Sequence, residues 1–424
     1  MTSLYDEFAW RGMIYDATEG LADVFEKERV TAYIGFDPTA SSLHVGSLLP
    51  VMALARLQRF GHTPIAIAGG GTGMIGDPSG KSQERNLLSV EQIDENLAGI
   101  KQQLARFLDF ERGNNPARIV NNAEWLAGLD LLGFLRDTGK YFTVNYMLQK
   151  ESVSRRLESE DGISYTEFSY LLLQARDFVE LFDRYNCTLQ MGGSDQWGNI
   201  TAGIDLIRRL RAKKAHGLVM PLVTTASGVK FGKTEVGTIW LDPARTSPFK
   251  FYQFWLNTDD RDAVDYLKFF TFLEREAVAA LEDAARTAPE KREAQRALAR
   301  EVTALVHGQS QVTRAEQASN VLFGEDITTL DVEEVLAVFE DVPSTELPGN
   351  TFDAEGIGMV DLVARVQLAP SKSEARRLVQ SGGVYVNNRR MSDPQARLTR
   401  DQAIGGRLFV LRKGQKQTHL VRLT

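Results

Sequence analysis

The first 220 residues alternate short apolar runs with longer segments in which apolar residues recur every three or four positions. Short apolar runs predict buried strands, and the longer periodicity predicts amphipathic helices. The predicted strands are 30–36, 63–68 and 188–191, and the predicted helices are 48–60, 89–108, 164–182 and 199–210. Ser164 and Glu167 have the spacing of a capping box at the start of one helix. Alternating strands and helices favour an α/β domain built on a sheet.

Residues 248–320 follow a different pattern, in which helical periodicity dominates and no convincing strand pattern occurs. The segments 261–272 and 290–306 are the clearest examples, so we expect a helical domain here. Residues 321–350 hold eight Asp and Glu and no Lys or Arg, and they end in a Pro-Gly-Asn breaker. We interpret this stretch as an acidic linker.

Residues 351–424 are expected to form a small α+β module. Helices are predicted at 360–367 and 372–380, a hairpin at 384–390, and strands at 408–412 and 418–423. Asn387 and Asn388 tolerate the positive φ that the hairpin turn needs. The module has 13 Lys and Arg and six Asp and Glu, a net charge of +7 within a chain of net −7. This asymmetry favours a polyanionic partner, although a solvated basic face would give the same count.

Composition narrows the class of protein further. The 424 residues contain a single cysteine, Cys187, which excludes an internal disulfide framework and is typical of a reducing cytosol. No apolar run reaches the roughly 20 residues of a membrane helix, so we expect no membrane partner. Residues 1–10 carry Asp6 and Glu7 and lack the basic-then-apolar order of a signal peptide. A cytoplasmic protein is therefore expected.

Two glycine-rich strings match nucleotide-binding motifs only in part. Residues 71–76 have the spacing G-x-G-x-x-G, but the Asp-Pro-Ser-Gly string that follows breaks the helix that a dinucleotide fold needs. Residues 80–82 resemble the end of a P-loop, but Ile75 occupies the position of its first glycine. We reject the P-loop, and an NAD-dependent oxidoreductase stays only as a distant third alternative. The charged residues after this strand remain candidates, since open α/β sheets bind ligands there: Asp77, Lys81 and Arg85.

The segment 36–47 carries the first candidate site. It leads from a predicted strand through Phe-Asp-Pro-Thr-Ala to Ser-Leu-His-Val-Gly-Ser and the start of a helix. Free N–H groups and the helix dipole make such a start an anion site, and Gly46 would let a nucleotide approach the backbone. His44 would add a side-chain donor; the alternative is that His44 only caps the helix.

Residues 229–234 carry the second candidate site. Lys230 and Lys233 lie three positions apart in a loop, with Thr234 beside them. Two such cations suit a clamp for a polyphosphate. The alternative is a pair of solvated loop charges.

The predicted helix at 164–182 carries a polar stripe within an apolar surface. Three of its residues occupy positions i, i+4 and i+7 and share one face: Tyr170, Gln174 and Asp177. Such a stripe must find internal partners or bind a ligand. Alternation on the strand at 30–36 also puts three residues on one face: Tyr33, Gly35 and Asp37. The two faces would converge on one small ligand, although an internal hydrogen-bond network is the alternative.

Together and in this order, the histidine and lysine segments resemble the HIGH and KMSKS signatures of class I aminoacyl-tRNA synthetases. Further motifs extend the resemblance to the bacterial tyrosyl-tRNA synthetase family: residues 33–39 (YIGFDPT), 76–81 (GDPSGK), 145–147 (NYM) and 192–199 (GGSDQWGN). The resemblance implies a Rossmann-like parallel-sheet catalytic domain at 1–220, a signature loop and connector at 221–247, a helical anticodon-region domain at 248–320, an acidic linker at 321–350 and a small RNA-binding domain at 351–424.

The resemblance also implies an activity and its partners. This family uses ATP to convert L-tyrosine to tyrosyl-adenylate and pyrophosphate, and then transfers the tyrosyl group to the 3′ end of tRNA(Tyr). Mg²⁺ is expected to accompany ATP without a dedicated cage of protein ligands. A homodimer with tRNA spanning both subunits is also expected.

The resemblance implies a role for each residue that matches a family motif. The phenol of tyrosine is expected at Tyr33 and Asp177, its ammonium group at Asp77, Tyr170 and Gln174, and its carboxyl end at Gln196. The phosphates of ATP are expected at Thr39, His44, Lys230, Lys233 and Thr234, joined by Lys81 and Arg85. The other expected ATP-binding residues are Gly35, Asp37, Gly46, Ser47 and Asp195, with Asp195 at the ribose.

Two departures from the family pattern affect the phosphate side. Ser47 stands where the HIGH motif usually ends in His, so its contact with phosphate is expected to be weaker or water-mediated. Pro50 lies early in the following helix, where its ring fits only near the first turn. A synthetase for another aromatic amino acid is the main rival, and Tyr33 with Asp177 argues for a phenol over an indole. A non-catalytic RNA-binding relative is the second rival, and the intact signature residues argue against it.

Overall fold

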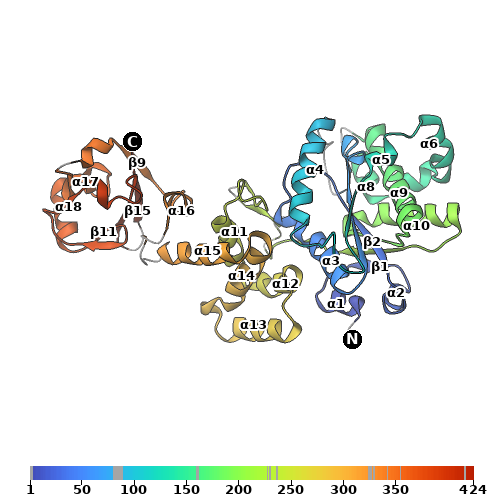
Figure 1. The fold of residues 1–424 in the computed structure, drawn as a ribbon, viewed down its shortest axis with the longest axis horizontal. Coiled ribbons are helices and arrows are strands. Elements are labelled where there is room, and N and C mark those ends of the chain that lie inside the picture. Colours follow the sequence, from blue (N-terminus) through green and yellow to red (C-terminus); the bar gives the residue numbers. More distant parts are fainter. Residues whose placement is uncertain are drawn as a thin grey trace. The chain divides into compact units, whose positions relative to one another are not determined.

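The computed structural model places six strands in one sheet, in the order β1-β6-β5-β2-β3-β4 (Figure 1). Five of them run parallel: β2 (Thr31–Phe36), β3 (Thr63–Ala68), β4 (Arg118–Asn121), β5 (Leu189–Gly193) and β6 (His216–Met220). The edge strand β1 (Asp16–Ala17) pairs antiparallel with β6. The expected parallel-sheet α/β fold is therefore confirmed.

The structure describes residues 3–79, 89–158, 162–226, 228, 231–234, 237–322, 327, 330–340, 342–353, 355–414 and 417–424. For Ser152, Lys233, Thr234 and Leu322 it describes the backbone alone.

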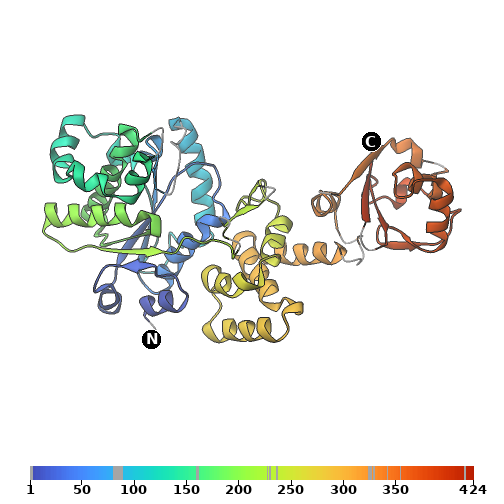
Figure 2. The same ribbon diagram turned by 180° about the vertical axis from the view of Figure 1, so that it is seen from behind.

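Helices cover both faces of the six-stranded sheet. Helix α3 (Leu48–Arg59) packs against β2 and β3, while α9 (Tyr165–Tyr185) and α10 (Trp197–Arg211) form the layer on the other side, as both views show (Figures 1 and 2). Strand β3 is buried from its second residue onward, because a strand covered on both sides needs apolar residues throughout.

The start of α9 confirms one half of the predicted capping box. The Ser164 side chain accepts the N–H of Glu167 at 3.2 Å. The Glu167 carboxylate forms a buried ion pair with Arg156 at 2.9 Å, which joins α9 to the helix before it.

Further elements complete the part of the chain before residue 245. The α-helices are α1 (Leu4–Trp10), α2 (Leu21–Lys27), α4 (Val90–Leu104), α5 (Ala123–Leu126), α6 (Leu131–Asp137), α7 (Val144–Leu148) and α8 (Glu151–Leu157). The 3₁₀ helices are η1 (Val45–Ser47), η2 (Thr72–Met74), η3 (Gly139–Tyr141) and η4 (Ser194–Gln196), and a short ribbon consists of β7 (Lys233–Thr234) and β8 (Gly237–Thr238).

The helices expected between residues 248 and 320 also form. They are α11 (Pro248–Leu256), α12 (Asp260–Phe270), α13 (Arg275–Thr287), α14 (Glu293–His307) and α15 (Gln309–Leu322), with the 3₁₀ helix η5 (Pro289–Lys291). The chain divides into two compact units: Met1–Arg245 with Asn257–Val306, and Thr246–Leu256 with His307–Thr424. The first unit contains α12 and α13 and nearly all of α14, and the second contains α11 and α15.

The second unit ends in a five-stranded sheet of order β12-β11-β14-β15-β9. Its strands are β12 (Arg389–Met391), β11 (Val384–Val386), β14 (Leu408–Lys413), β15 (Gln417–Leu423) and β9 (Ser344–Leu347). Helices α17 (Met359–Arg365) and α18 (Lys372–Gln380), the ribbon of β10 (Ile357–Gly358) with β13 (Arg397–Leu398), and the 3₁₀ helices η7 (Gly349–Phe352) and η8 (Arg400–Gln402) surround it. The predicted hairpin is confirmed, since Asn387 and Asn388 have φ of 48° and 63°.

The segment 321–350 differs from the expected acidic linker. It contains α16 (Val332–Val338), whose Val335 packs in a core cluster with Val410 and Leu420. It also contains β9, which pairs in parallel with β15. The acidic composition misled the prediction because acidic residues such as Glu333 and Glu346 alternate with apolar residues that are buried, such as Val335 and Leu347.

In the part of the chain that the structure describes, no helix is both long enough and apolar enough to span a bilayer.

Candidate active site

The site lies where the strand order of the six-stranded sheet reverses. From β2 the chain proceeds outward to β3 and β4, and then returns to form β5 and β6 on the other side of β2. Ligands of open α/β sheets bind at the carboxyl ends of the strands beside such a reversal. The residues that follow β2 and β5, Asp37 onward and Ser194 onward, are therefore the first candidates.

The loop after β2 is held by α4. Asn96 donates its side-chain N–H to the carbonyl of Pro38 at 2.8 Å, and the side chain of Gln103 accepts the N–H of Leu43 at 2.8 Å. Gly99 lies so close to this loop that a Cβ would meet the carbonyl oxygen of Ser41. The amphipathic helix thus fixes the path that leads to His44.

His44 begins η1, and its Nδ1 accepts the N–H of Gly46 at 3.0 Å. This is the capping role that we considered as the alternative. The two roles are compatible, because a neutral imidazole that accepts at Nδ1 carries its proton on Nε2 and can donate there. The ring packs edge-on against Trp240, with ring centroids 6.1 Å apart. Pro50 lies at the third position of α3, within the first turn, as its ring requires.

The two signature segments lie side by side although they are far apart in sequence. Val45 donates its N–H to the carbonyl of Ile239 at 3.0 Å, and Leu241 donates to the carbonyl of Leu43 at 2.9 Å. Gly232 has φ of 82°, and a Cβ there would lie 2.7 Å from the side chain of Val45. The strand β7 begins at the next residue, so the backbone of the predicted lysine loop passes directly beside the histidine segment.

The structure places the backbone of Lys233 and Thr234 at this edge. Three further predicted phosphate-binding residues lie outside the described residues: Lys81, Arg85 and Lys230. Thr39 is exposed in the loop after β2, and its N–H donates to the carbonyl of Asp37 at 2.9 Å.

The polar face of α9 meets β2 among buried side chains. Asp177 is 3% exposed; it accepts a hydrogen bond from Asn122 at 2.9 Å and another from the indole N–H of Trp125 at 2.7 Å. Burial raises the pKa of Asp177 to about 7, and the two donated hydrogen bonds oppose that shift.

Tyr33 lies in the same pocket with its ring edge-on to Phe178, the centroids being 5.3 Å apart. Burial, and after it the charge of Asp177, raises the pKa of Tyr33 well above its ordinary value, so the hydroxyl keeps its proton. Its oxygen is buried and has no hydrogen-bond partner among the residues that the structure describes. A buried hydroxyl without a partner is unfavourable in a folded protein unless a ligand supplies one.

A second polar cluster connects α9 with the segments after β3 and β5. Gln196 donates to Asp77 at 2.7 Å and accepts from Gln174 at 3.1 Å. Asn199 donates to Gln174 at 3.0 Å, and Ser79 donates its N–H to Asp77 at 2.9 Å. The cluster leaves the negative charge of Asp77 held by neutral donors, which suits a cationic group of a ligand.

The predicted residues that the structure describes all lie in the first unit, on α9, in or after β2, β3 and β5, and in the ribbon strand β7. Tyr170 is buried on the same helix as Gln174 and Asp177. Asp195 is exposed in η4, while Gly35 and Gly46 expose their backbone. Asp37 lies against Gly69, where a Cβ would come within 2.6 Å of its carboxylate.

Sequence reasoning missed three side chains that orient the predicted ones: Asn122, Trp125 and Asn199. Asn122 and Trp125 follow β4, another strand whose carboxyl end reaches the same edge of the sheet. The pattern Asn-x-x-Trp directly after an apolar run was the available signal, since polar residues at strand ends are where ligand sites form.

Among the described residues, no group of three or more His, Cys, Asp or Glu side chains is placed to hold a metal ion.

Comparison with known proteins agrees with this geometry. The model of the class I tRNA synthetases of the W and Y type matches residues 26–324, and that of the tyrosine–tRNA ligase SYY-like C-terminal domain matches residues 334–421. A tyrosine–tRNA ligase of Roseiflexus castenholzii is 57% identical over 423 residues, which cover 100% of both chains. One of Geobacillus kaustophilus is 52% identical over 422 residues, covering 99% of each.

The chain belongs to the tyrosine–tRNA ligase family of class I tRNA synthetases. Its function is accordingly that of an ATP-dependent tyrosine–tRNA ligase. The C-terminally truncated mitochondrial tyrosyl-tRNA synthetase of Aspergillus nidulans has a similar structure, with a TM-score of 0.69 and 33% identity over 76% of this chain and 95% of that one. The start of the C-terminal match at residue 334 also agrees with the inclusion of α16 and β9 in that domain.

Proposed function

We propose that L-tyrosine binds between β2 and α9 with its phenol at Asp177 and Tyr33. The observation that carries this assignment is the buried Tyr33 hydroxyl without a partner, near a buried carboxylate. The phenol would donate to Asp177 and accept from Tyr33, which satisfies both groups at once. Phenylalanine offers neither interaction and would leave both groups unpaired, which gives the pocket its discrimination.

The ammonium and carboxyl groups of tyrosine are assigned to the second polar cluster. Asp77 supplies the negative charge for the ammonium group, with Tyr170 and Gln174 as neutral partners, and Gln196 is placed at the carboxyl end. The hydrogen bonds that these side chains make with one another support the assignment, because they fix the polar atoms before the ligand arrives.

ATP is assigned to the edge where the two signature segments meet. Its phosphates would contact the start of η1 and α3 and the lysine loop, with these residues involved: Thr39, His44, Gly46, Ser47, Lys81, Arg85, Lys230, Lys233 and Thr234. Asp195 would bind the ribose, and Gly35 and Asp37 complete the ATP contact. Mg²⁺ would enter with ATP, coordinated mainly by phosphate and water oxygens.

The proposed reaction needs positioning and charge more than acid–base catalysis. A carboxylate oxygen of tyrosine attacks the α-phosphorus of ATP, the bond from that phosphorus to the bridging oxygen breaks, and pyrophosphate leaves. The carboxylate is already deprotonated, so no base is required. His44 through Nε2 and the lysines stabilise the charge that develops on the phosphates. A ribose hydroxyl of tRNA then attacks the tyrosyl carbonyl, and AMP leaves.

The test of this assignment is exchange of pyrophosphate with ATP in the presence of each of the twenty amino acids. We expect tyrosine to support the highest kcat/KM. A higher value with phenylalanine or tryptophan would contradict the phenol assignment, and exchange with no amino acid would favour the non-catalytic rival.

We further propose that the chain acts as a homodimer in the cytoplasm, joined through the exposed apolar side chains between residues 131 and 165. These include Leu131 and Leu132, which are 70% and 76% exposed, together with Leu135, Val144, Leu148, Leu157 and Tyr165. So many exposed apolar side chains between residues 131 and 165 favour an interaction surface there. Sedimentation should show a dimer that Leu132→Glu dissociates, whereas an unchanged dimer would place the interface elsewhere.

The C-terminal domain is assigned to tRNA. Because β9 and α16 belong to it, the informative truncation removes residues 323–424 and leaves no unpaired strand. We expect adenylate formation to persist and tRNA charging to be lost almost completely. Loss of both activities in parallel would mean that the domain supports the fold of the catalytic unit.

A further inference from the structure

Two arginine side chains are buried at the base of the catalytic unit. Arg11, directly after α1, and Arg56, on α3, are 3% and 1% exposed. Burial, and after it the neighbouring charge of Arg11, lowers the pKa of Arg56. Buried guanidinium groups are unfavourable unless strong partners surround them, so the pair must have such partners.

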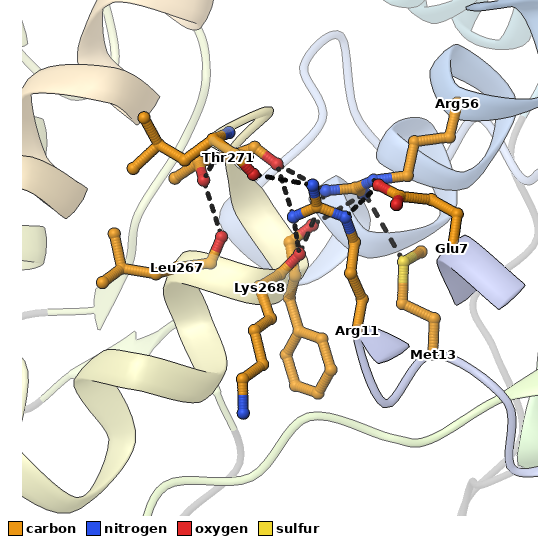
Figure 3. Close-up of polar contacts among 9 residues, drawn as sticks. Glu7, Arg11, Met13, Arg56, Leu267, Lys268 and Thr271 are labelled. Atoms are coloured by element: carbon orange, nitrogen blue, oxygen red, sulfur yellow. Dashed lines mark hydrogen bonds and ion pairs between the residues drawn. The ribbon is translucent and has the colours of Figure 1, made fainter. Parts of the chain in front are cut away.

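Those partners are backbone carbonyls at the end of α12, toward which both guanidinium groups point (Figure 3). Arg56 donates to Lys268 and Phe269 at 3.0 Å each and to Thr271 at 2.5 Å. Arg11 donates to Lys268 at 2.9 Å, to Thr271 at 3.3 Å and to Leu273 at 2.8 Å. The carbonyls of Lys268 and Phe269 lie in the last turn of α12, where a helix leaves them without intrahelical partners, and those of Thr271 and Leu273 follow directly after the helix.

The charge balance of this cluster also favours the helix end. One carboxylate, Glu7, pairs with Arg11 and lies 4.0 Å from the Nε of Arg56. Arg59, a third cation beside Arg56, is offset by Glu274, so the cluster keeps a net positive charge beside the negative end of the α12 dipole. The arginines therefore fix the C-terminus of α12 against α1 and α3.

The same helix supports the lysine loop. The ring of Phe231 stacks on Phe270 at 5.3 Å, nearly parallel, and packs edge-on against Tyr266 at 5.0 Å. The Tyr266 hydroxyl donates to the carbonyl of Thr224 at 3.3 Å, and the side chain of Asp262 accepts the N–H of Ala226 at 2.9 Å. Contacts from α12 thus reach the lysine loop both before residue 227 and at Phe231, between the two signature lysines.

Helix α3 completes the connection. It begins directly after the histidine segment and carries Arg56 near its other end. We propose that Arg56, assisted by Arg11, is a positioning residue that sets the distance between the histidine segment and the lysine loop by fixing α12 against α3. The inference rests on the proposed role of the lysine loop at ATP.

An arginine is needed because of its shape. Its planar fork reaches three carbonyls from one side chain, which a lysine ammonium on a flexible stem does not hold with the same geometry. Arg56→Lys keeps the charge and loses the fork, so it separates orientation from charge.

The test compares the rate of adenylate formation per active site in Arg56→Gln, Arg56→Lys and the unchanged enzyme. The number of active sites is counted from the burst of adenylate formation. We expect the rate of adenylate formation to fall about 10-fold or more in Arg56→Gln, since small misplacements of catalytic groups have large effects on rate. The rate for Arg56→Lys should lie between that of Arg56→Gln and that of the unchanged enzyme. The dissociation constant of tyrosine should stay within about twofold, because the proposed phenol partners lie on β2, α9 and the segment after β4, whereas Arg56 acts on α12. An unchanged rate per site, with only lower stability or fewer active sites, would overturn the proposal.

Two controls distinguish the possible failures. Arg106 also caps a helix end, donating to the carbonyl of Val306 on α14 at 2.7 Å, and Arg106→Gln should leave the rate per site unchanged. A decrease there equal to that of Arg56→Gln would contradict a specific role for α12. Lys233→Ala tests the proposed function itself: if it leaves adenylate formation unaffected, the role of the loop at ATP fails first.

A double-mutant cycle keeps the proposal testable if Arg56→Gln folds poorly. Arg11→Gln removes the second arginine and leaves Arg56 in place. The double variant with Phe231→Leu should lower the rate per site by a smaller factor than the product of the factors for the two single variants, because both changes act through α12. Multiplicative effects would show that the arginines and the loop act independently.

Discussion

The pocket proposed for tyrosine and the edge proposed for the phosphates both adjoin β2 and are built in opposite ways. In the pocket, buried side chains hold one another: Asp177 accepts from Asn122 and Trp125, and the Tyr33 hydroxyl awaits a ligand. At the proposed phosphate edge, Gly35 and Gly46 are exposed, and the backbone of Gly232 in the lysine loop passes beside the histidine segment. The polar atoms of the proposed pocket are in place before a ligand binds. The positive charge of the proposed phosphate edge would come from the lysine loop, which is distant in sequence.

This difference follows from what each region must recognise. A phenol differs from a phenyl ring by one hydroxyl, so discrimination depends on buried partners that lose a hydrogen bond when the hydroxyl is missing. A transferring phosphate spreads negative charge over several oxygens, and cations near it lower the barrier. Substitutions in the pocket should therefore change which amino acid is used, and substitutions at the edge should change how fast the reaction runs.

Lys233→Ala should give the largest effect. We expect adenylate formation to fall about 100-fold or more, the size seen when one charge-stabilising donor is removed from an active site. The affinity for tyrosine, measured by equilibrium binding without ATP, should not change. A parallel loss of tyrosine affinity would show that the two regions are not separable.

Substitutions of Tyr33 and Asp177 should give the next largest effect, which is a loss of selectivity for tyrosine over phenylalanine. Asp177→Ala is expected to reduce the ratio of kcat/KM for tyrosine over phenylalanine about 100-fold, and Tyr33→Phe about 10-fold, in line with a charged and a neutral hydrogen bond. Pyrophosphate exchange with both amino acids measures this ratio. Equal losses for tyrosine and phenylalanine would remove these residues from the phenol site.

The same contrast explains how much the sequence could predict. The strands at 31–36 and 63–68 and the helix around Asp177 follow from periodicity, which local burial determines directly. The polar stripe on α9 and the alternation on β2 predicted that their faces meet, and they do. Asn122 and Trp125 were missed because β4, the four-residue strand before them, was not predicted, so the polar residues after it were not recognised as a strand end.

The second unit shows a different limit of sequence reasoning. Charge density suggested a linker at 321–350, yet β9 pairs with β15, which lies more than 70 residues further along the chain. Four residues of strand are too short to stand out from their surroundings, and their partner is not local in sequence. Nonlocal strand pairing of this kind cannot be inferred from composition.

The pH dependence of tyrosine binding should distinguish the pocket from the edge as well. The pKa of Asp177 in the free protein is raised to about 7 by burial. Below that pH the Asp177 carboxyl is protonated and can no longer accept the hydrogen bond of the phenol as a charged carboxylate. The affinity for tyrosine should therefore fall as the pH decreases from 7 to 5. The fall should approach about tenfold per pH unit, and Asp177→Asn should flatten the profile.

The stability of the free protein should respond in the opposite direction. A folded-state pKa above the unfolded value of 3.8 means that the folded protein binds a proton that the unfolded chain releases. The contribution of Asp177 is therefore full below pH 3.8 and is lost as the pH rises through 7. The difference in thermal midpoint between the unchanged protein and Asp177→Asn, followed across this range, measures it.

Trp125→Phe should give the smallest effect. The substitution keeps an aromatic ring and removes the indole N–H that donates to Asp177 at 2.7 Å. Because this hydrogen bond favours the charged carboxylate, its loss should raise the pKa of Asp177 and move the midpoint of tyrosine binding upward by about one pH unit, the equivalent of one hydrogen bond. Affinity at pH 7 should then fall severalfold and recover at pH 9.

Trp255→Phe is the matched control, because Trp255 is also a buried tryptophan, on α11, and its substitution should leave the midpoint unchanged. A midpoint that stays in place in Trp125→Phe would mean that the remaining partners of Asp177, Asn122 among them, are enough to hold its carboxylate in the charged form.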